Sequence, residues 1–206
     1  MTKKTNLLIA AVLSSIASVS AYAAAPIAAP GTEGLPIFAS ATDPLVATYQ
    51  GNSAGTIYSN DLYLMLNSSG QAGNDGNLSN DLLIFNSSAS SVGETKNLGP
   101  FASGTELMFR LHVTNTGHDF FTGPASSNPD GQFHARVEQN WLPNTTLVSF
   151  EDLHDSTGNS RIFNDLSFSL TNTNTVAAAV PEPEAYAMML AGLGLVSVVI
   201  RRRKKA

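Results

Sequence analysis

The chain has 206 residues, a net charge of −5 and no cysteine, which excludes disulfides and thiolate metal sites. Residues 26–180 contain fourteen acidic and four basic residues, a net charge of 4 − 14 = −10, which argues against nucleic acid as a partner and favours cations. These 155 residues (180 − 26 + 1) are enough for one domain with its own hydrophobic core.

The N-terminus has the features of a secretory signal peptide. Lys3 and Lys4 precede an apolar run over residues 7–19, and small residues follow at positions 21 and 23. We therefore predict a signal peptide over residues 1–23, with Ala25 as a second candidate cleavage position, and an exported body. An N-terminal membrane anchor is the alternative, which the shortness of the apolar run disfavours.

The body, predicted as one acidic domain over residues 24–179, is dominated by strand patterns. Apolar and polar residues alternate over residues 106–114, with Leu107, Phe109, Leu111 and Val113 on one side. Further strands are expected over residues 62–66, 82–85, 132–138, 146–150 and 166–170. Gly, Asn, Ser and Pro clusters separate these runs and are typical of turns. We predict an all-β fold, an antiparallel and jelly-roll-like β-sandwich.

Two details of these strands bear on later results. In the run at 132–138, the alternation predicts that Phe133, Ala135 and Val137 point inwards and that His134 lies on a solvated face. The tripeptide Asn-Asp-Leu opens three of the predicted strands, at residues 60–62, 80–82 and 164–166. We interpret it as turn chemistry before a strand rather than as a repeat, because the spacings are unequal.

The loop between the last two predicted strands is rich in oxygen ligands. Calcium takes six to eight oxygens from carboxylates, amides, carbonyls and water, and this loop offers them without the ligand order of an EF-hand. We predict a Ca²⁺ site there, and a polar turn without an ion is the alternative. The candidate ligands are Asp152, Asp155, Asn164 and Asp165, with Asp130 from a neighbouring loop.

Residues 105–170 resemble the bacterial exported-protein domain of unknown function 4114. The resemblance rests on the Phe-Glu-Asp-Leu stretch at 150–153, the Phe-Asn-Asp stretch at 163–165, and Asn-Pro-Asp-Gly at 128–131 followed by His134. It implies an adhesin-like, calcium-associated surface protein. Ser160 and Ile162 stand where the family pattern has aspartates, so this chain lacks two carboxylates of that pattern.

The sequence contains no clear set of residues for catalysis, and we predict that the protein is not an enzyme. Glu151 and Asp152 are adjacent, and neighbours on a strand point to opposite faces, which does not suit a glycosidase pair. The histidines lack the close spacing of a metal-binding motif; they are His112, His118, His134 and His154.

The C-terminus resembles the PEP-CTERM sorting signal of exported Gram-negative bacterial proteins. Pro181, Glu182 and Pro183 precede an uncharged run at 185–200, and five basic residues follow at 201–205. We predict a transmembrane helix in this segment, with the basic end in the cytoplasm. The resemblance over residues 180–206 implies recognition by an exosortase, a membrane processing enzyme. A simple C-terminal membrane anchor is the alternative.

Together these features predict an exported protein of the cell surface or the exopolysaccharide matrix with a structural or adhesive role. Before processing it would be anchored in the inner membrane with its body in the periplasm. Its expected partners are the exosortase and exopolysaccharide or other surface proteins. The alternative is a calcium-dependent carbohydrate-binding module.

Overall fold

The computed structural model describes residues 24–40, 43–53, 57–154 and 161–176. Within these ranges the protein is all-β, with eleven strands, two short 3-10 helices and no α-helix. None of these residues forms a helix with the length and hydropathy needed to cross a bilayer. The predicted signal peptide (1–23) and sorting segment (180–206) lie outside the described residues.

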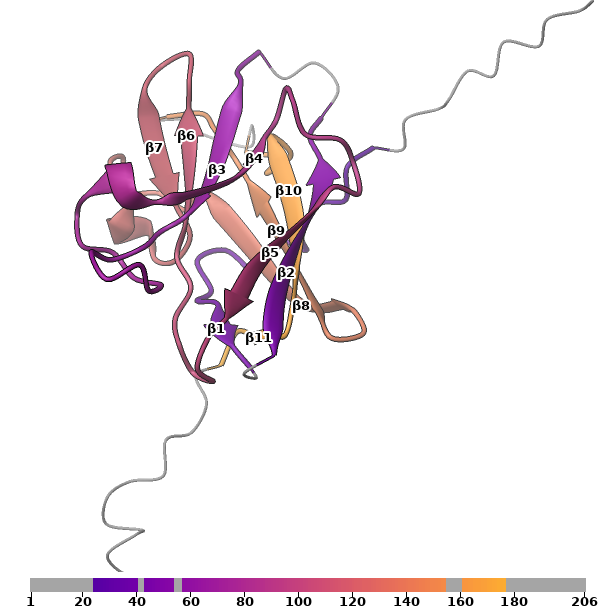
Figure 1. Ribbon diagram of the computed structural model, residues 1–206. Helices are drawn as coiled ribbons and strands as arrows, with labels where there is room; N and C mark the ends of the chain where they lie inside the picture. Colours follow the sequence, from indigo (N-terminus) through magenta and orange to yellow (C-terminus); the bar gives the residue numbers. More distant parts are fainter. Residues whose placement is uncertain (1–23, 41–42, 54–56, 155–160, 177–206) are drawn as a thin grey trace, which may run out of the picture.

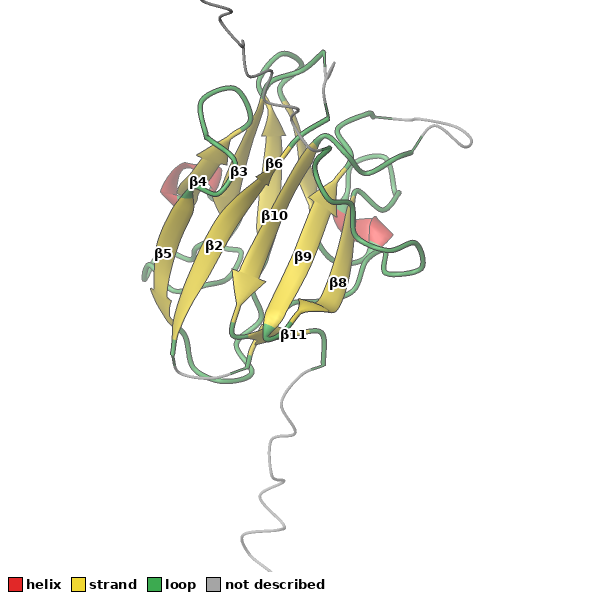
Figure 2. Cartoon of the chain, turned by 90° about the vertical axis from the view of Figure 1, so that its right-hand side faces the viewer, coloured by secondary structure: helices red, strands yellow, loops and turns green. Residues whose placement is uncertain are grey.

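One layer of the fold is a sheet of five antiparallel strands, seen face-on in Figure 2. Each strand hydrogen-bonds to its neighbours in an antiparallel register. In spatial order the strands are β5 (Thr95–Pro100), β2 (Pro44–Gly51), β10 (Leu166–Thr171), β9 (Thr145–Phe150) and β8 (Ala135–Leu142).

The second layer is a sheet of four antiparallel strands, which lies beside the first in Figure 1. Its order is β4 (Leu82–Asn86), β3 (Asn60–Leu64), β6 (Phe109–Val113) and β7 (His118–Phe121). The short strands β1 (Phe38–Ala39) and β11 (Thr173–Asn174) form a separate pair, and the 3-10 helices are η1 (Leu78–Asn80) and η2 (Ala125–Ser127).

The structure confirms the prediction of an all-β fold with antiparallel sheets. The strand order departs from a jelly roll, in which consecutive strands pass between the two sheets. Here β8, β9 and β10 are consecutive neighbours in one sheet, and β3–β4 and β6–β7 are neighbours in the other. The short connections after β6 and β8 favour these in-sheet hairpins.

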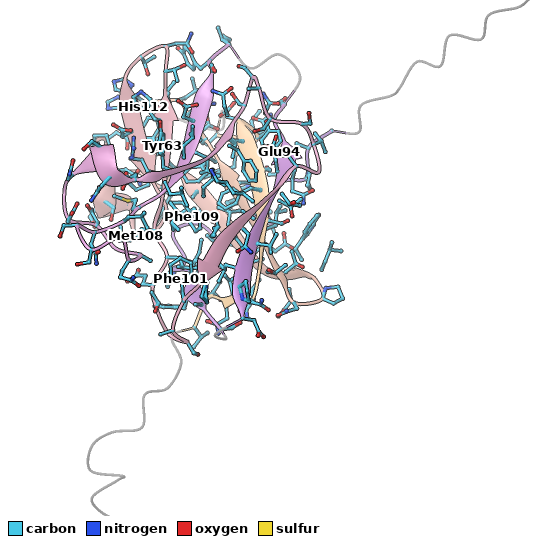
Figure 3. The ribbon with its side chains drawn as sticks, viewed as in Figure 1. Tyr63, Glu94, Phe101, Met108, Phe109 and His112 are labelled. Carbon is cyan, nitrogen blue, oxygen red and sulfur yellow. The ribbon has the colours of Figure 1, made fainter. Side chains whose placement is uncertain are left out.

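The hydrophobic core lies between the two sheets. Side chains of Phe109, Leu111 and Val113 are fully buried, which confirms the alternation predicted for this strand. Phe109 of β6 meets Phe168 of β10 with ring centroids 5.0 Å apart, a tilted contact across the layers. Figure 3 shows Phe109 towards the middle of the molecule, whereas Tyr63 of β3 and His112 of β6 lie further from the middle. The two sheets therefore share one core.

The outer face of the five-stranded sheet is partly covered by the N-terminal segment of the described chain. The Ala28 N–H donates to Ser149 Oγ at 2.9 Å, and Ser149 Oγ is hydrogen-bonded to Ser167 Oγ at 3.0 Å. Ala28, Ser149 and Ser167 are all buried. The serines of β10 are therefore inaccessible, although the alternation of the sequence places them on the face away from the core.

Residues 133 and 134 contradict the predicted strand alternation. Strand β8 begins only at Ala135, so these two residues belong to the preceding loop and do not follow the period of the strand. His134 is fully buried, and the Phe133 side chain is 41% exposed. The prediction of a solvated His134 was wrong, because its ring packs on Phe120 at a centroid distance of 3.7 Å and an interplanar angle of 9°.

Candidate metal centre

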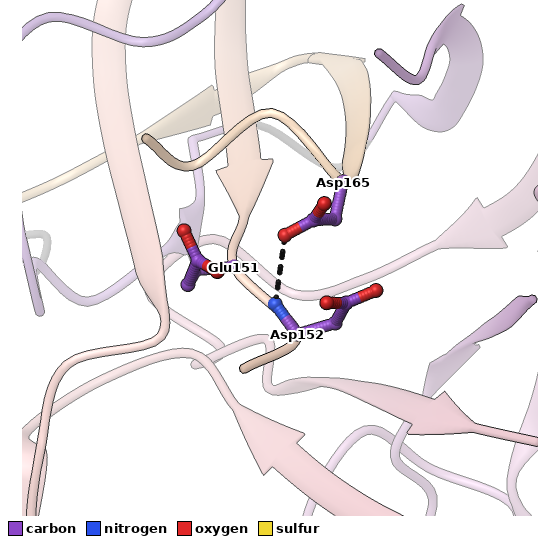
Figure 4. A group of neighbouring side chains, drawn as sticks. All are labelled: Glu151, Asp152 and Asp165. Atoms are coloured by element: carbon purple, nitrogen blue, oxygen red, sulfur yellow. Dashed lines mark hydrogen bonds between the residues drawn. The ribbon is translucent and has the colours of Figure 1, made fainter. Parts of the chain in front are cut away.

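The antiparallel pairing of β9 and β10 brings the acidic residues of the loop together. Leu166 pairs with Phe150, so the end of β9 lies beside the start of β10. The Asp165 N–H donates to the Phe150 carbonyl at 3.0 Å, which continues this pairing by one residue. Glu151 and Asp152 follow β9 directly, and Asp165 precedes β10, so their side chains meet at one end of the sheet (Figure 4).

Three carboxylates form the centre of this arrangement. One carboxylate oxygen from each of Glu151, Asp152 and Asp165 lies within 4.8 Å of the others. Glu151 and Asp152 are buried, and Asp165 is half-buried. Oxygen-rich groups of this kind are the ligands that calcium and magnesium prefer. We refer to these three residues as the acidic centre.

Hydrogen bonds fix the orientation of each carboxylate. Asp165 Oδ2 accepts the Asp152 N–H at 2.9 Å (Figure 4). Glu151 Oε2 accepts the N–H groups of Ile162 at 2.8 Å and Phe163 at 3.2 Å. Glu151 thereby holds the segment that leads into β10. The acidic centre is therefore positioned before any ion binds.

A buried amide completes the surroundings of the acidic centre. Asn60, the first residue of β3 in the other sheet, donates from Nδ2 to Asp152 Oδ2 at 2.8 Å. Asn60 is fully buried, and its Oδ1 accepts no hydrogen bond from the described residues. A buried acceptor without a donor is costly. A cation bound beside it would satisfy this oxygen as well as the carboxylates.

Burial and mutual repulsion disfavour full ionisation of the acidic centre. Burial raises the pKa of Asp165 to about 8, and the charge of Asp152 acts in the same direction. Burial also raises the pKa of Asp152, while the hydrogen bond from Asn60 opposes this effect. The acidic centre therefore retains a proton near neutral pH. A divalent cation would displace that proton, because metal ligands must be deprotonated.

Of the five predicted ligands, the structure brings Asp152 and Asp165 together. Glu151 was not among the predicted ligands. The expectation that Glu151 and Asp152 point to opposite faces, which we used against a glycosidase pair, assumed that both lie on a strand. The strand ends at Phe150, so that reasoning does not apply to them. Asp155 lies outside the described residues.

The two remaining candidates have other neighbours. The Asn164 carbonyl accepts the Ser53 N–H at 2.8 Å, and Asn164 borders a separate hollow beside the N-terminal segment. The Asp130 side chain is fully buried; it lies 2.9 Å from His134 Nε2 and forms an ion pair with Arg161 at 3.1 Å. His134 in turn contacts the Glu151 carbonyl through Nδ1 at 2.8 Å. Asp130 therefore supports the main chain of the acidic centre without joining it.

Comparison with known proteins identifies one segment of the chain. Residues 179–204 match the PEP-CTERM protein-sorting motif. No curated protein and no solved structure matches the chain. The match agrees with the predicted sorting signal, including Pro181, Glu182 and Pro183, which lie outside the described residues. The chain thus carries a sorting motif of the kind that a membrane-bound exosortase processes, which implies export with membrane-anchored transit before processing.

Proposed function

We propose that this protein is an exported component of the cell surface or the exopolysaccharide matrix, with a structural or adhesive role that calcium supports. The sorting motif at 179–204 supports export. The acidic centre of Glu151, Asp152 and Asp165 is the observation that carries the calcium part of the proposal. The ion would link the end of β9 to the start of β10 and, through Asn60, to the other sheet.

Calcium suits the acidic centre better than a transition metal does. All its ligand atoms are carboxylate or amide oxygens, which hard cations prefer. Burial, and after it the charge of the neighbouring carboxylates, raises the pKa values of Asp152 and Asp165, and a divalent ion would offset both effects. Bound calcium would therefore stabilise the loop end of the fold and keep its surface in one conformation.

Thermal unfolding of residues 24–179 with and without millimolar calcium tests this proposal. An ion at about 100 times its dissociation constant adds about 2.7 kcal/mol, or about 5 to 10 °C in Tm for a domain of this size. We expect Asp152→Ala and Asp165→Ala to remove the shift. Asp75→Ala, in an exposed loop, is the control that should retain it. The same small shift in all four proteins would contradict a specific site.

A second candidate function is a calcium-dependent carbohydrate-binding module. Exposed Phe133 borders a hollow of about 360 Å³ together with Arg161 and Phe163, and aromatic rings with nearby polar groups suit small-molecule pockets. Glu151 holds the main chain of this wall through its bond to the Phe163 N–H. Glycan-array binding that EDTA abolishes and Phe133→Ala weakens would favour this function over a purely structural one.

We assign no catalytic role to the protein. Two of the three acidic-centre carboxylates are buried, and the carboxylates are tied to main-chain N–H or amide groups, an arrangement that suits an ion better than a substrate. Release of sugars from isolated exopolysaccharide by the purified domain, lost in Glu151→Gln, would overturn this assignment.

A further inference from the structure

The fold brings together histidines that are far apart in the sequence. His118 is the first residue of β7, and His154 follows the end of β9 by four residues. Their rings are stacked, with centroids 4.6 Å apart and an interplanar angle of 25°. Both side chains are half-buried. Two imidazoles in contact at a partly accessible position are a candidate site for a nitrogen-ligated metal.

The pair lies on the core side of β7 and connects the two sheets. His118 pairs with Val113, whose side chain is buried in the core, so His118 points to the same face. Phe120, two residues further along β7, is on that face too and lies 6.1 Å from the His118 ring and 6.3 Å from the His154 ring. The buried Phe120 therefore lies beside both imidazoles.

The two rings are close enough for both to bind one ion. A metal–nitrogen bond of about 2.0 Å places each ring centroid about 3.2 Å from the ion, so two rings at 90° lie about 4.5 Å apart, and at a tetrahedral angle about 5.2 Å. The stacked rings lie 4.6 Å apart, so they are near enough for both to reach one ion. Binding would require the imidazoles to turn from this stacked arrangement until one nitrogen of each ring faces the ion.

No hydrogen bond to the His118 ring is found among the described residues, so its nitrogens are available as ligands. His112 differs, because its Nδ1 is 3.0 Å from Asp119 Oδ1 on the other face of the sheet. We propose that His118 and His154 form a binding site for a divalent transition metal that favours imidazole, with copper(II) as the tightest-binding ion, and that water fills the remaining positions.

This site is chemically distinct from the acidic centre. It offers nitrogen ligands, which calcium avoids, whereas the acidic centre offers only oxygens. A bound ion would connect β7 of one sheet to the segment that follows β9 of the other. It would therefore stabilise the contact between the two sheets at this side of the fold.

Copper(II) titration of residues 24–179, which contain every described strand, tests the proposal. We expect one ion per chain, with an electron paramagnetic resonance spectrum that shows coupling to two imidazole nitrogens. His118→Gln and His154→Gln should each weaken binding at least about tenfold and reduce the coupling to one nitrogen. His112→Gln is the matched control and should bind as the wild type does.

Two further measurements distinguish copper binding at the two histidines from misfolding of the variants and from binding at the acidic centre. Melting curves without metal establish that each glutamine variant is folded, and His118→Asn provides a second variant if the first is not. Asp165→Asn should leave copper binding unchanged while it removes any calcium response. The proposal is overturned if the His118 and His154 variants bind copper as the wild type does, if the bound ion couples to fewer than two imidazoles in the wild type, or if Asp165→Asn abolishes copper binding.

Discussion

The charge of Asp165 should reduce the stability of the metal-free protein, and Asp165→Asn should restore it. The pKa of this carboxyl is raised to about 8 in the folded state, whereas an unfolded Asp has a pKa of about 3.9. Between these values the folded chain holds one proton more than the unfolded chain. The free energy of unfolding therefore falls as pH rises from about 4 to 8, and the loss is complete above pH 8.

The size of this change in the free energy of unfolding follows from one additional proton bound per folded chain. Its full effect is about 1.4 kcal/mol per pH unit, and we expect about half of this because Asp165 is partly exposed and solvent screens its charge. Between pH 5 and 7 this gives about 1.4 kcal/mol, or about 3 to 6 °C in Tm. Asparagine can still accept the Asp152 N–H, so the variant keeps the hydrogen bond without the charge.

Thermal melts of the wild type and Asp165→Asn at pH 5, 6, 7 and 8, in a calcium chelator, measure this difference. Taking the difference between the two proteins cancels the pH dependence of all other groups that do not contact Asp165. We expect the variant to gain on the wild type as pH rises, and saturating calcium to reverse the order at pH 8. A constant difference across this pH range, or a variant that loses stability at pH 8 without calcium, would refute the reasoning.

Three other substitutions test the surrounding structure. Glu151→Gln removes the charge of an acceptor of two main-chain N–H groups, so we expect the free energy of unfolding in urea to fall by about 1 to 3 kcal/mol. The control Glu106→Gln, at an exposed position, should cost less than about 0.5 kcal/mol. His134→Ala should cost about 2 to 4 kcal/mol by the same measurement, because a fully buried ring and its hydrogen bonds are lost; a change under about 1 kcal/mol would contradict its structural role. Arg110→Met leaves the buried Asp81 carboxylate without its 2.9 Å ion pair, so we expect about 3 to 5 kcal/mol of destabilisation, and unchanged chemical denaturation would show that the pair contributes little.

The sequence predicted strands well where one face is buried and the other is polar. Over β6 the pattern is clear, because every second side chain enters the core. Strand β2 was missed although its residues alternate between buried and half-buried, and the two-residue strands β1 and β11 were missed too. Strands β5 and β7 were also not predicted. β5 contains Gly99 and Pro100, and β7 has only four residues, so neither shows a sustained alternation. In β10 the alternation predicted the strand but not its burial. Both of its faces are buried, because residues distant in the sequence cover its polar face.

The candidate sites show which contacts sequence reasoning can find. Asp152 and Asp165 could be paired because they lie at the two ends of the one loop that joins β9 to β10. Asn60 is 92 residues from Asp152, and only the packing of one sheet on the other brings them into contact. The Asn-Asp-Leu tripeptides at 60–62 and 164–166 were the available signal, and we interpreted them as turns. The contact between His118 and His154 arises in the same way from both sheets.

The position of the acidic centre within the fold bears on how an exported chain would present it. Asp165 lies directly before β10, and the β11 strand follows the other end of β10 (Figure 1). The six residues of β10 separate these ends by about 20 Å. The sorting motif starts at residue 179, three residues after the last described residue, Val176. A chain held at the membrane through that motif therefore has the acidic centre at the end of the domain remote from its attachment, and a calcium ion bound there, as we propose, would not lie at the membrane side of the domain.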